Sequence, residues 1–184
     1  MLNLPTWLTV SRIFLVPVVM VVILAKNERV GILVFLAACL TDFLDGYLAR
    51  KRNEVTTLGK LLDPIADKLL MSAAFISLVE VGVAPAWMVV IVVGREFAVT
   101  GLRSIAISQG IAIAASPWGK YKTISQVIAV VLLLLGPTGL GRFNYLGQVA
   151  LWIVVVLAVL SAADYFLKFS RQLGVVPGRP DGAA

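Results

Sequence analysis

The chain of 184 residues contains no histidine and only one cysteine, Cys39. Without histidine, any general base must be a carboxylate or a less usual group, because imidazole is the commonest side-chain base near neutral pH. A single cysteine excludes an internal disulfide and a metal site built from several cysteines. These absences exclude imidazole catalysis and point to oxygen ligands for any bound metal.

Charged residues are also scarce, at 14% of the chain, and only ten of them are acidic. Hydrophobic residues make up 60%, and the mean hydropathy is +0.96, whereas about half the residues of a soluble domain are apolar. This composition predicts an all-α integral membrane protein with about six transmembrane helices in a bundle, at about 20 apolar residues each. The net charge of +6 indicates cytoplasmic loops and anionic lipid or phosphate partners, and no nucleic acid.

Apolar runs and turn residues predict where the spans lie. The segment before Arg12 lacks the basic region of a targeting peptide, so we expect the run after it to be the first membrane helix. Residues 1–170 are predicted to form one catalytic domain, and 171–184 a polar, disordered tail. The predicted spans are 8–25, 30–50, 58–81, 86–108, 120–135 and 145–169.

The basic residues predict the orientation of these spans. With both termini inside, the outer turns hold only Lys26, Arg29 and Arg142, and most other basic residues near span ends fall on the inner side. Cytoplasmic loops are enriched in lysine and arginine, so both termini are predicted to be cytoplasmic. No eukaryotic transit peptide is visible, and we expect a bacterial inner membrane.

Four aspartates are concentrated in one predicted helix hairpin, at Asp42, Asp45, Asp63 and Asp67. Carboxylates in membrane-compatible sequence are costly and indicate a functional site. The pairs 42/67 and 45/63 are matched about the middle of the hairpin, so antiparallel helices would bring all four to one depth on facing surfaces. That depth is about 12 Å from the helix ends, at about 1.5 Å per residue, inside the cytoplasmic half of the membrane.

Four carboxylates at one depth cannot all stay ionised without a cation between them. Hard oxygen ligands favour Mg²⁺, Mn²⁺ or Ca²⁺, and a pair of such ions could bridge a diphosphate and stabilise an oxygen leaving group. Gly46, Ala49 and Gly59 lie on the same helix faces and leave room for close helix approach or for a nucleotide. Arg50 is placed to meet a phosphate at the cytoplasmic rim. For a single aspartate, an ion pair with Lys68, or with another nearby cation, remains the structural alternative.

The hairpin reads Asp42-x2-Asp45-Gly46-x2-Ala49-Arg50-x8-Gly59-x3-Asp63-x3-Asp67. This pattern resembles, without a departure, the signature of the CDP-alcohol phosphatidyltransferase family. Residues 3–12 resemble the amino-terminal segment of that family, and 95–97, 101–103 and 116–123 are similar to its branch that makes phosphatidylglycerophosphate. The resemblance implies a six-helix membrane fold, commonly dimeric, with a metal site open to the cytoplasm.

The resemblance also implies a reaction and a role for each signature residue. CDP-diacylglycerol would bind through its diphosphate to Mg²⁺ or Mn²⁺, and two such ions are expected. The 1-hydroxyl of sn-glycerol 3-phosphate would then attack the phosphorus that bears the lipid, and CMP would leave. Asp67 would be the general base, as well as a metal ligand or a neighbour of the metals. The other metal ligands would be Asp42, Asp45 and Asp63, and the residues lining the CDP-lipid site would be Asp42, Gly46, Ala49, Arg50 and Gly59.

Binding the phosphate of the acceptor requires basic residues that are not already paired with the four aspartates. The predicted set is Arg95, Arg103, Lys120 and Lys122, with Thr6 and Arg12 as further candidates. A structural interpretation stays open for each: Arg95 could pair with Glu96 or Asp164 for helix assembly, and the two lysines could be ordinary residues of a cytoplasmic helix end.

Two alternatives to this function also stay open. Sister enzymes with the same donor accept inositol phosphate, serine or phosphatidylglycerol, and the positive charge between residues 95 and 122 favours a phosphorylated acceptor. A metal-ion or proton-coupled transporter would also line a path with intramembrane carboxylates. The clustering of the acids in one hairpin, and the absence of a visible sequence repeat, favour the enzyme.

Overall fold

The computed structural model describes residues 4–52, 57–108 and 118–172, and within them the side chains of 13–41, 65–108, 121–136 and 139–170. All regular structure in these ranges is helical, as the sequence predicts. The elements are α1 (Leu4–Leu24), α2 (Glu28–Arg52), α3 (Thr57–Glu80), α4 (Ala86–Ser108), α5 (Trp118–Leu140), the 3₁₀ turn η1 (Gly141–Phe143) and α6 (Tyr145–Gln172). Each predicted helix is present, with bounds that differ from the prediction by a few residues.

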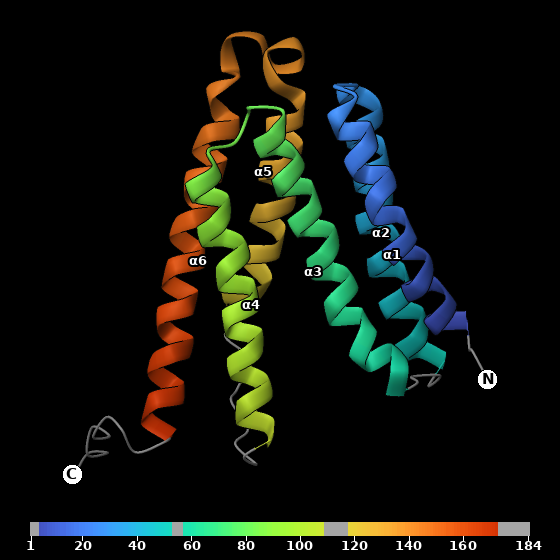
Figure 1. Cartoon of the computed structure of the whole chain (residues 1–184), viewed down its shortest axis with the longest axis vertical. Helices are drawn as coiled ribbons and strands as arrows, with labels where there is room; N and C mark the ends of the chain where they lie inside the picture. The colour runs from blue at the N-terminus through green and yellow to red at the C-terminus, as the bar shows by residue number, and fades with distance from the viewer. Residues whose placement is uncertain (1–3, 53–56, 109–117, 173–184) are drawn as a thin grey trace.

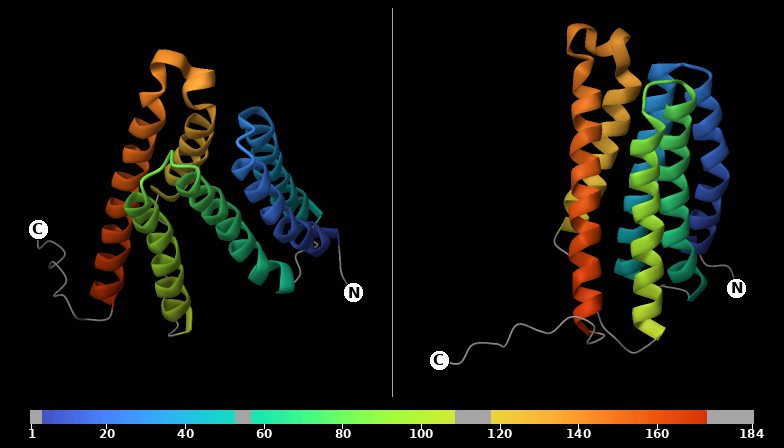
Figure 2. Two further views of the ribbon diagram at one scale, coloured as in Figure 1. Left: turned by 45° about the horizontal axis from the view of Figure 1, so that its top comes forward. Right: turned by 60° about the vertical axis from the view of Figure 1, so that its left-hand side comes forward.

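The helices run alternately up and down one bundle (Figure 1). The first and last described residues lie at the same end, which we call the terminal end, and the α1–α2, α3–α4 and α5–α6 connections lie at the other, which we call the turn end. The side view in Figure 2 shows the same arrangement. The order of the helices therefore places the acid-bearing ends of α2 and α3 at the terminal end.

α3 lies between two groups of helices, as Figure 1 shows. α1 packs against α2 and α3, α6 packs against α4 and α5, and α3 also contacts α4 and α5. The reason is a buried stripe on α3, where Ala66, Leu70, Ala74 and Leu78 recur at every fourth residue and so share one helix face. The stripe extends to Ala66, which directly precedes Asp67, so core packing holds the backbone of α3 in place next to this aspartate.

Length and composition identify one described helix that could cross a membrane, over Gly141–Ser170, with a mean hydropathy of 2.3 in its most apolar window. Shorter apolar helices cover Ile13–Leu24 and Tyr121–Gly136. In α4, the charged residues Arg95, Glu96 and Arg103 interrupt the apolar sequence. The molecule is thus an all-helical protein with one candidate span among its described residues, and the six-span interpretation stays a prediction.

The predicted turn cluster after residue 135 has a clear backbone signature. Gly136 has φ 47° and ψ −156° inside α5, which breaks the helix into two parts. A positive φ of this size is costly for residues with a Cβ and free for glycine. The long apolar part of α5 therefore ends at the position where the sequence predicts it to end.

Candidate active site

The predicted acidic hairpin lies at the terminal end, on α2 and α3. Asp42, Asp45, Gly46, Ala49 and Arg50 belong to α2, and Gly59, Asp63 and Asp67 belong to α3. Of this set, only Asp67 has a described side chain. The convergence of the four carboxylates and the lining of the CDP-lipid site therefore stay predictions. The structure gives the helix to which each of these residues belongs.

Asp67 lies one residue beyond the buried Ala66 on α3, and its own side chain is half-buried. Its negative charge acts on the ammonium group of Lys122, which belongs to α5. The two residues are far apart in the sequence, and the helices that carry them, α3 and α5, pack against each other. The predicted base is thus within electrostatic range of one of the predicted acceptor cations.

Glu96 of α4 is the centre of a buried polar cluster. Its Oε1 atom forms an ion pair with Nζ of Lys122, lies 3.3 Å from Nη1 of Arg95, and accepts a hydrogen bond of 3.3 Å from Nε2 of Gln126. The side chains of Lys122, Arg95 and Glu96 are only 8%, 11% and 14% exposed. Buried charges need partners of opposite sign, and Glu96 is the acidic partner of both cations in this cluster.

The sequence interpretation named the Arg95–Glu96 pair as an alternative, and this pair is confirmed. The sequence did not predict the hydrogen bond from Gln126 to Glu96 or the ion pair between Lys122 and Glu96. A signal for the amide existed, because Lys122 and Gln126 are four residues apart and lie on one face of α5. Asp164, the other partner considered for Arg95, accepts a hydrogen bond of 2.8 Å from Lys168 one turn later in α6.

The cluster retains an unused buried donor. Nε of Arg95 is shielded from solvent and has no hydrogen-bond partner among the described residues. Buried donors in native proteins are almost always paired, so an orphan of this kind calls for a ligand, an ion or water. Two cations share the Glu96 carboxylate here, and the remaining donors are suited to a phosphate oxygen.

Arg103 lies on the same helix as Arg95 but has a different environment. Its Nε donates to the Tyr165 hydroxyl at 3.4 Å, and its guanidinium carbon lies 5.9 Å from the centre of the Tyr165 ring. Arg103 is thereby held at the α4–α6 contact. Of the predicted acceptor set, the structure brings Arg95 and Lys122 together, whereas the side chains of Lys120, Thr6 and Arg12 lie outside the described residues.

The predicted metal ligands lie mostly outside the described side chains. No group of three or more histidine, cysteine or acidic side chains occurs among the side chains that the structure describes, and three of the four predicted ligands lie outside that set. The donor chemistry of four aspartates on α2 and α3 fits a hard divalent cation. The identity and number of the ions stay predictions.

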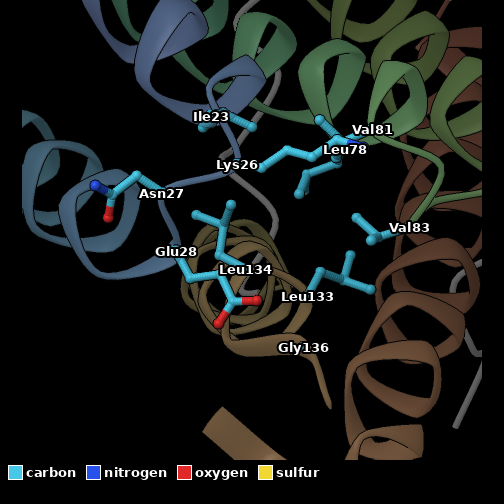
Figure 3. Close-up of a pocket in the computed structure, with 10 residues that line it drawn as sticks. All are labelled: Ile23, Lys26, Asn27, Glu28, Leu78, Val81, Val83, Leu133, Leu134 and Gly136. Carbon is cyan, nitrogen blue, oxygen red and sulfur yellow. The ribbon is translucent and has the colours of Figure 1, made fainter. Parts of the chain in front are cut away.

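A separate pocket of about 140 Å³ opens at the turn end. Figure 3 shows the Lys26 side chain reaching toward Leu78 and Val81, and the Glu28 carboxylate lying beside Gly136. The rest of the lining is mainly aliphatic, from Ile23, Val83, Leu133 and Leu134. None of the signature residues lines this pocket, so it is distinct from the predicted site.

Comparisons with known proteins cover most of the chain. A family model described as CDP-alcohol phosphatidyltransferase matches residues 2–160. A Bacillus subtilis protein named CDP-diacylglycerol–glycerol-3-phosphate 3-phosphatidyltransferase is 45% identical over 185 residues, which cover 91% of this chain and 95% of the relative. A Rickettsia typhi protein of the same name is 37% identical, with 90% and 96% covered. A Mycobacterium tuberculosis protein named probable phosphatidylglycerophosphate synthase is 35% identical, with 94% and 84% covered.

Proposed function

The chain belongs to the CDP-alcohol phosphatidyltransferase family, and we propose that it transfers the phosphatidyl group from CDP-diacylglycerol to sn-glycerol 3-phosphate. The products are phosphatidylglycerophosphate and CMP. Relatives that align over about nine-tenths of the chain carry the name of this activity. The structural observation that supports the acceptor is the largely buried Arg95–Glu96–Lys122 cluster between α4 and α5.

The donor end of the reaction belongs to the acidic hairpin. Asp42, Asp45, Asp63 and Asp67 would hold two divalent ions, Mg²⁺ or Mn²⁺, which suit carboxylate oxygens. When bound, such ions neutralise the diphosphate and stabilise the departing oxygen of CMP. Small residues at Gly46, Ala49 and Gly59 leave space for the cytidine moiety against the helix backbones, and Arg50 contributes a cation for the phosphate.

The chemical step is an in-line displacement at phosphorus. Asp67 accepts the proton of the acceptor's 1-hydroxyl as the new bond forms between that oxygen and the phosphorus bearing the diacylglycerol. The bond from this phosphorus to the oxygen of CMP breaks, and CMP leaves with the electron pair. The protein's task is mainly to hold the two reactants in line and to stabilise charge, which are the largest contributions to reactions of this kind.

The acceptor end of the reaction belongs to α4 and α5. Arg95 and Lys122 bind the phosphate of glycerol 3-phosphate, with Lys120 and Arg103 as further cations of the same site. Asp67 and Lys122 belong to α3 and α5, which contact each other, and glycerol 3-phosphate, with a hydroxyl at one end and a phosphate at the other, would lie between them. An acceptor without a phosphate, such as serine, would leave the cations unused.

The enzyme is proposed to be a multi-pass protein of the bacterial inner membrane. The composition predicts six spans, and the charge asymmetry of the loops predicts that both termini and the active site face the cytoplasm. This orientation agrees with the first and last described residues lying at one end of the bundle. The relatives named above are bacterial. A homodimer is part of the proposal, as the family resemblance implies.

An acceptor panel tests the function. The purified protein, in mixed micelles with CDP-diacylglycerol and Mg²⁺ or Mn²⁺, is offered glycerol 3-phosphate, inositol phosphate, serine or phosphatidylglycerol, and CMP release is measured. We expect release with glycerol 3-phosphate. Release with another alcohol and none with glycerol 3-phosphate would overturn the acceptor assignment. Metal uptake into proteoliposomes without CMP release under any condition would overturn the enzymatic assignment as a whole.

A further inference from the structure

We propose that Glu96 is a positioning residue for the acceptor: its carboxylate holds Lys122 and Arg95 side by side, so that both cations bind one phosphate group. The inference rests on the proposed function, because it concerns the same acceptor site. It assigns to an acidic residue a role in binding an anionic substrate, which charge alone would not suggest. The reasons lie in the geometry of the buried cluster.

The first reason is the repulsion that the cluster must overcome. Arg95 and Lys122 come from different helices and carry like charges, and the charge of Arg95 acts unfavourably on the Lys122 ammonium. Both side chains are about nine-tenths buried, where like charges repel more strongly than in water. Without an anion between them, the two side chains would move apart. Oε1 of Glu96 contacts both and keeps them together.

The second reason is that the carboxylate itself is held in one orientation. Gln126 is 3% exposed and donates from Nε2 to the same Oε1 atom at 3.3 Å. Since Gln126 and Lys122 share one face of α5, the amide and the ammonium approach the carboxylate from the same helix. The oxygen is therefore fixed between α4 and α5 before any substrate arrives, which reduces the ordering cost of binding.

The third reason is the donors that remain. Nε of Arg95 is buried and has no partner among the residues that the structure describes. A guanidinium carries five N–H groups and an ammonium three, and a cluster built only for helix assembly would use its buried donors within the protein. Glu96 leaves these donors available to phosphate oxygens, to which charge-assisted hydrogen bonds are strong.

The test compares three variants of the full-length enzyme in mixed micelles, with separate KM values for glycerol 3-phosphate and for CDP-diacylglycerol. Glu96→Gln keeps the shape but loses the charge, Glu96→Asp keeps the charge, and Glu80→Gln is the control because Glu80 is exposed at the end of α3. We expect Glu96→Gln to raise the KM for glycerol 3-phosphate about tenfold and to leave that for CDP-diacylglycerol within about twofold. Glu96→Asp should restore part of the loss, and Glu80→Gln should behave as the wild type.

An unchanged or lower KM for glycerol 3-phosphate in Glu96→Gln would overturn the inference, because Glu96 would then compete with the substrate or serve only structure. An equal rise for both substrates would also count against it. If Glu96→Gln does not fold, Gln126→Met tests the same idea with all charges retained, and should raise only the acceptor KM, by about threefold. The acceptor panel on the wild type judges the proposed function separately: if another phosphorylated alcohol is the acceptor, the KM ratios are measured with that alcohol.

Discussion

Two regions of the bundle hold charged side chains in opposite environments. Between α4 and α5, Arg95, Glu96 and Lys122 share a largely buried cluster, whereas at the turn end Lys26 and Arg29 are exposed and the neighbouring pocket is mainly aliphatic. Both regions belong to one packed bundle. They differ in whether the charged side chains are solvated or paired with each other.

Buried charge carries more information than exposed charge. A lysine in a turn is solvated and needs no partner, while a buried lysine requires a compensating group. The cluster around Glu96 meets this requirement incompletely, because Nε of Arg95 lacks a partner among the described residues. This unpaired donor supports the proposed binding of an anion at the cluster, and the following experiments would sharpen or break this contrast with the turn end.

Metal removal should have the largest effect on activity, and it should act through the acidic hairpin of α2 and α3 at the terminal end. Chelation by EDTA is expected to reduce CMP release to background, since four carboxylates and a diphosphate cannot come together without cations. Mg²⁺ or Mn²⁺ added in excess should restore activity. Full activity after exhaustive dialysis against the chelator would contradict the proposed metal site.

Asp67→Asn should follow, with a loss of turnover of about 100-fold or more, the usual contribution of a general base. Thermal unfolding of the purified variant should show that the fold persists, because Asp67 is only half-buried. Asp164→Asn is the control at the same end, where Asp164 pairs with Lys168 on the surface of α6. Retained turnover in Asp67→Asn would show that Asp67 is not the base.

Lys120→Ala should have a smaller and more selective effect. We expect the KM for glycerol 3-phosphate to rise about fivefold, because a lysine that binds the phosphate at the start of α5 is lost. The KM for CDP-diacylglycerol should change little. Initial rates of CMP release at varied concentrations of each substrate give both values. An equal loss toward the two substrates would count against the assignment of Lys120 to the acceptor.

Lys26→Gly should have the smallest effect and should act on stability alone. Lys26 has a φ of 55° in the α1–α2 turn, a left-handed conformation that glycine adopts without strain. Relief of this strain is expected to stabilise the fold by about 0.5–1 kcal/mol, seen as a slightly higher thermal midpoint. Both KM values should be unchanged, and a change in either would break the separation between the two ends.

Much of the fold is predictable because its signals are local. The fourth helix is expected over 86–108 and is observed over Ala86–Ser108, since Gly82 and Pro85 interrupt the preceding helix. The fifth apolar run is expected to stop at residue 135 and does, at the positive φ of Gly136. Helix periodicity and turn residues act within a few positions, so they can be interpreted without tertiary contacts.

The candidate site divides along a different line. The signature spacing from Asp42 to Asp67 is a property of the sequence, and it was enough to predict the family and the expected chemistry. The partners of the cations were not predictable in the same way. Arg95 had two acidic candidates, and Gln126 carried no signal of its own beyond its distance from Lys122.

The sequence by itself therefore determined the helices, their order and the acidic hairpin, because periodicity, turn residues and motif spacing are encoded along the chain. Only the tertiary structure decided that Glu96 meets Lys122 and that Arg103 meets Tyr165. These pairs join different helices, and their distances depend on how α4, α5 and α6 pack. Packing brings together residues that are distant in sequence, and electrostatics in a buried site depends on those distances.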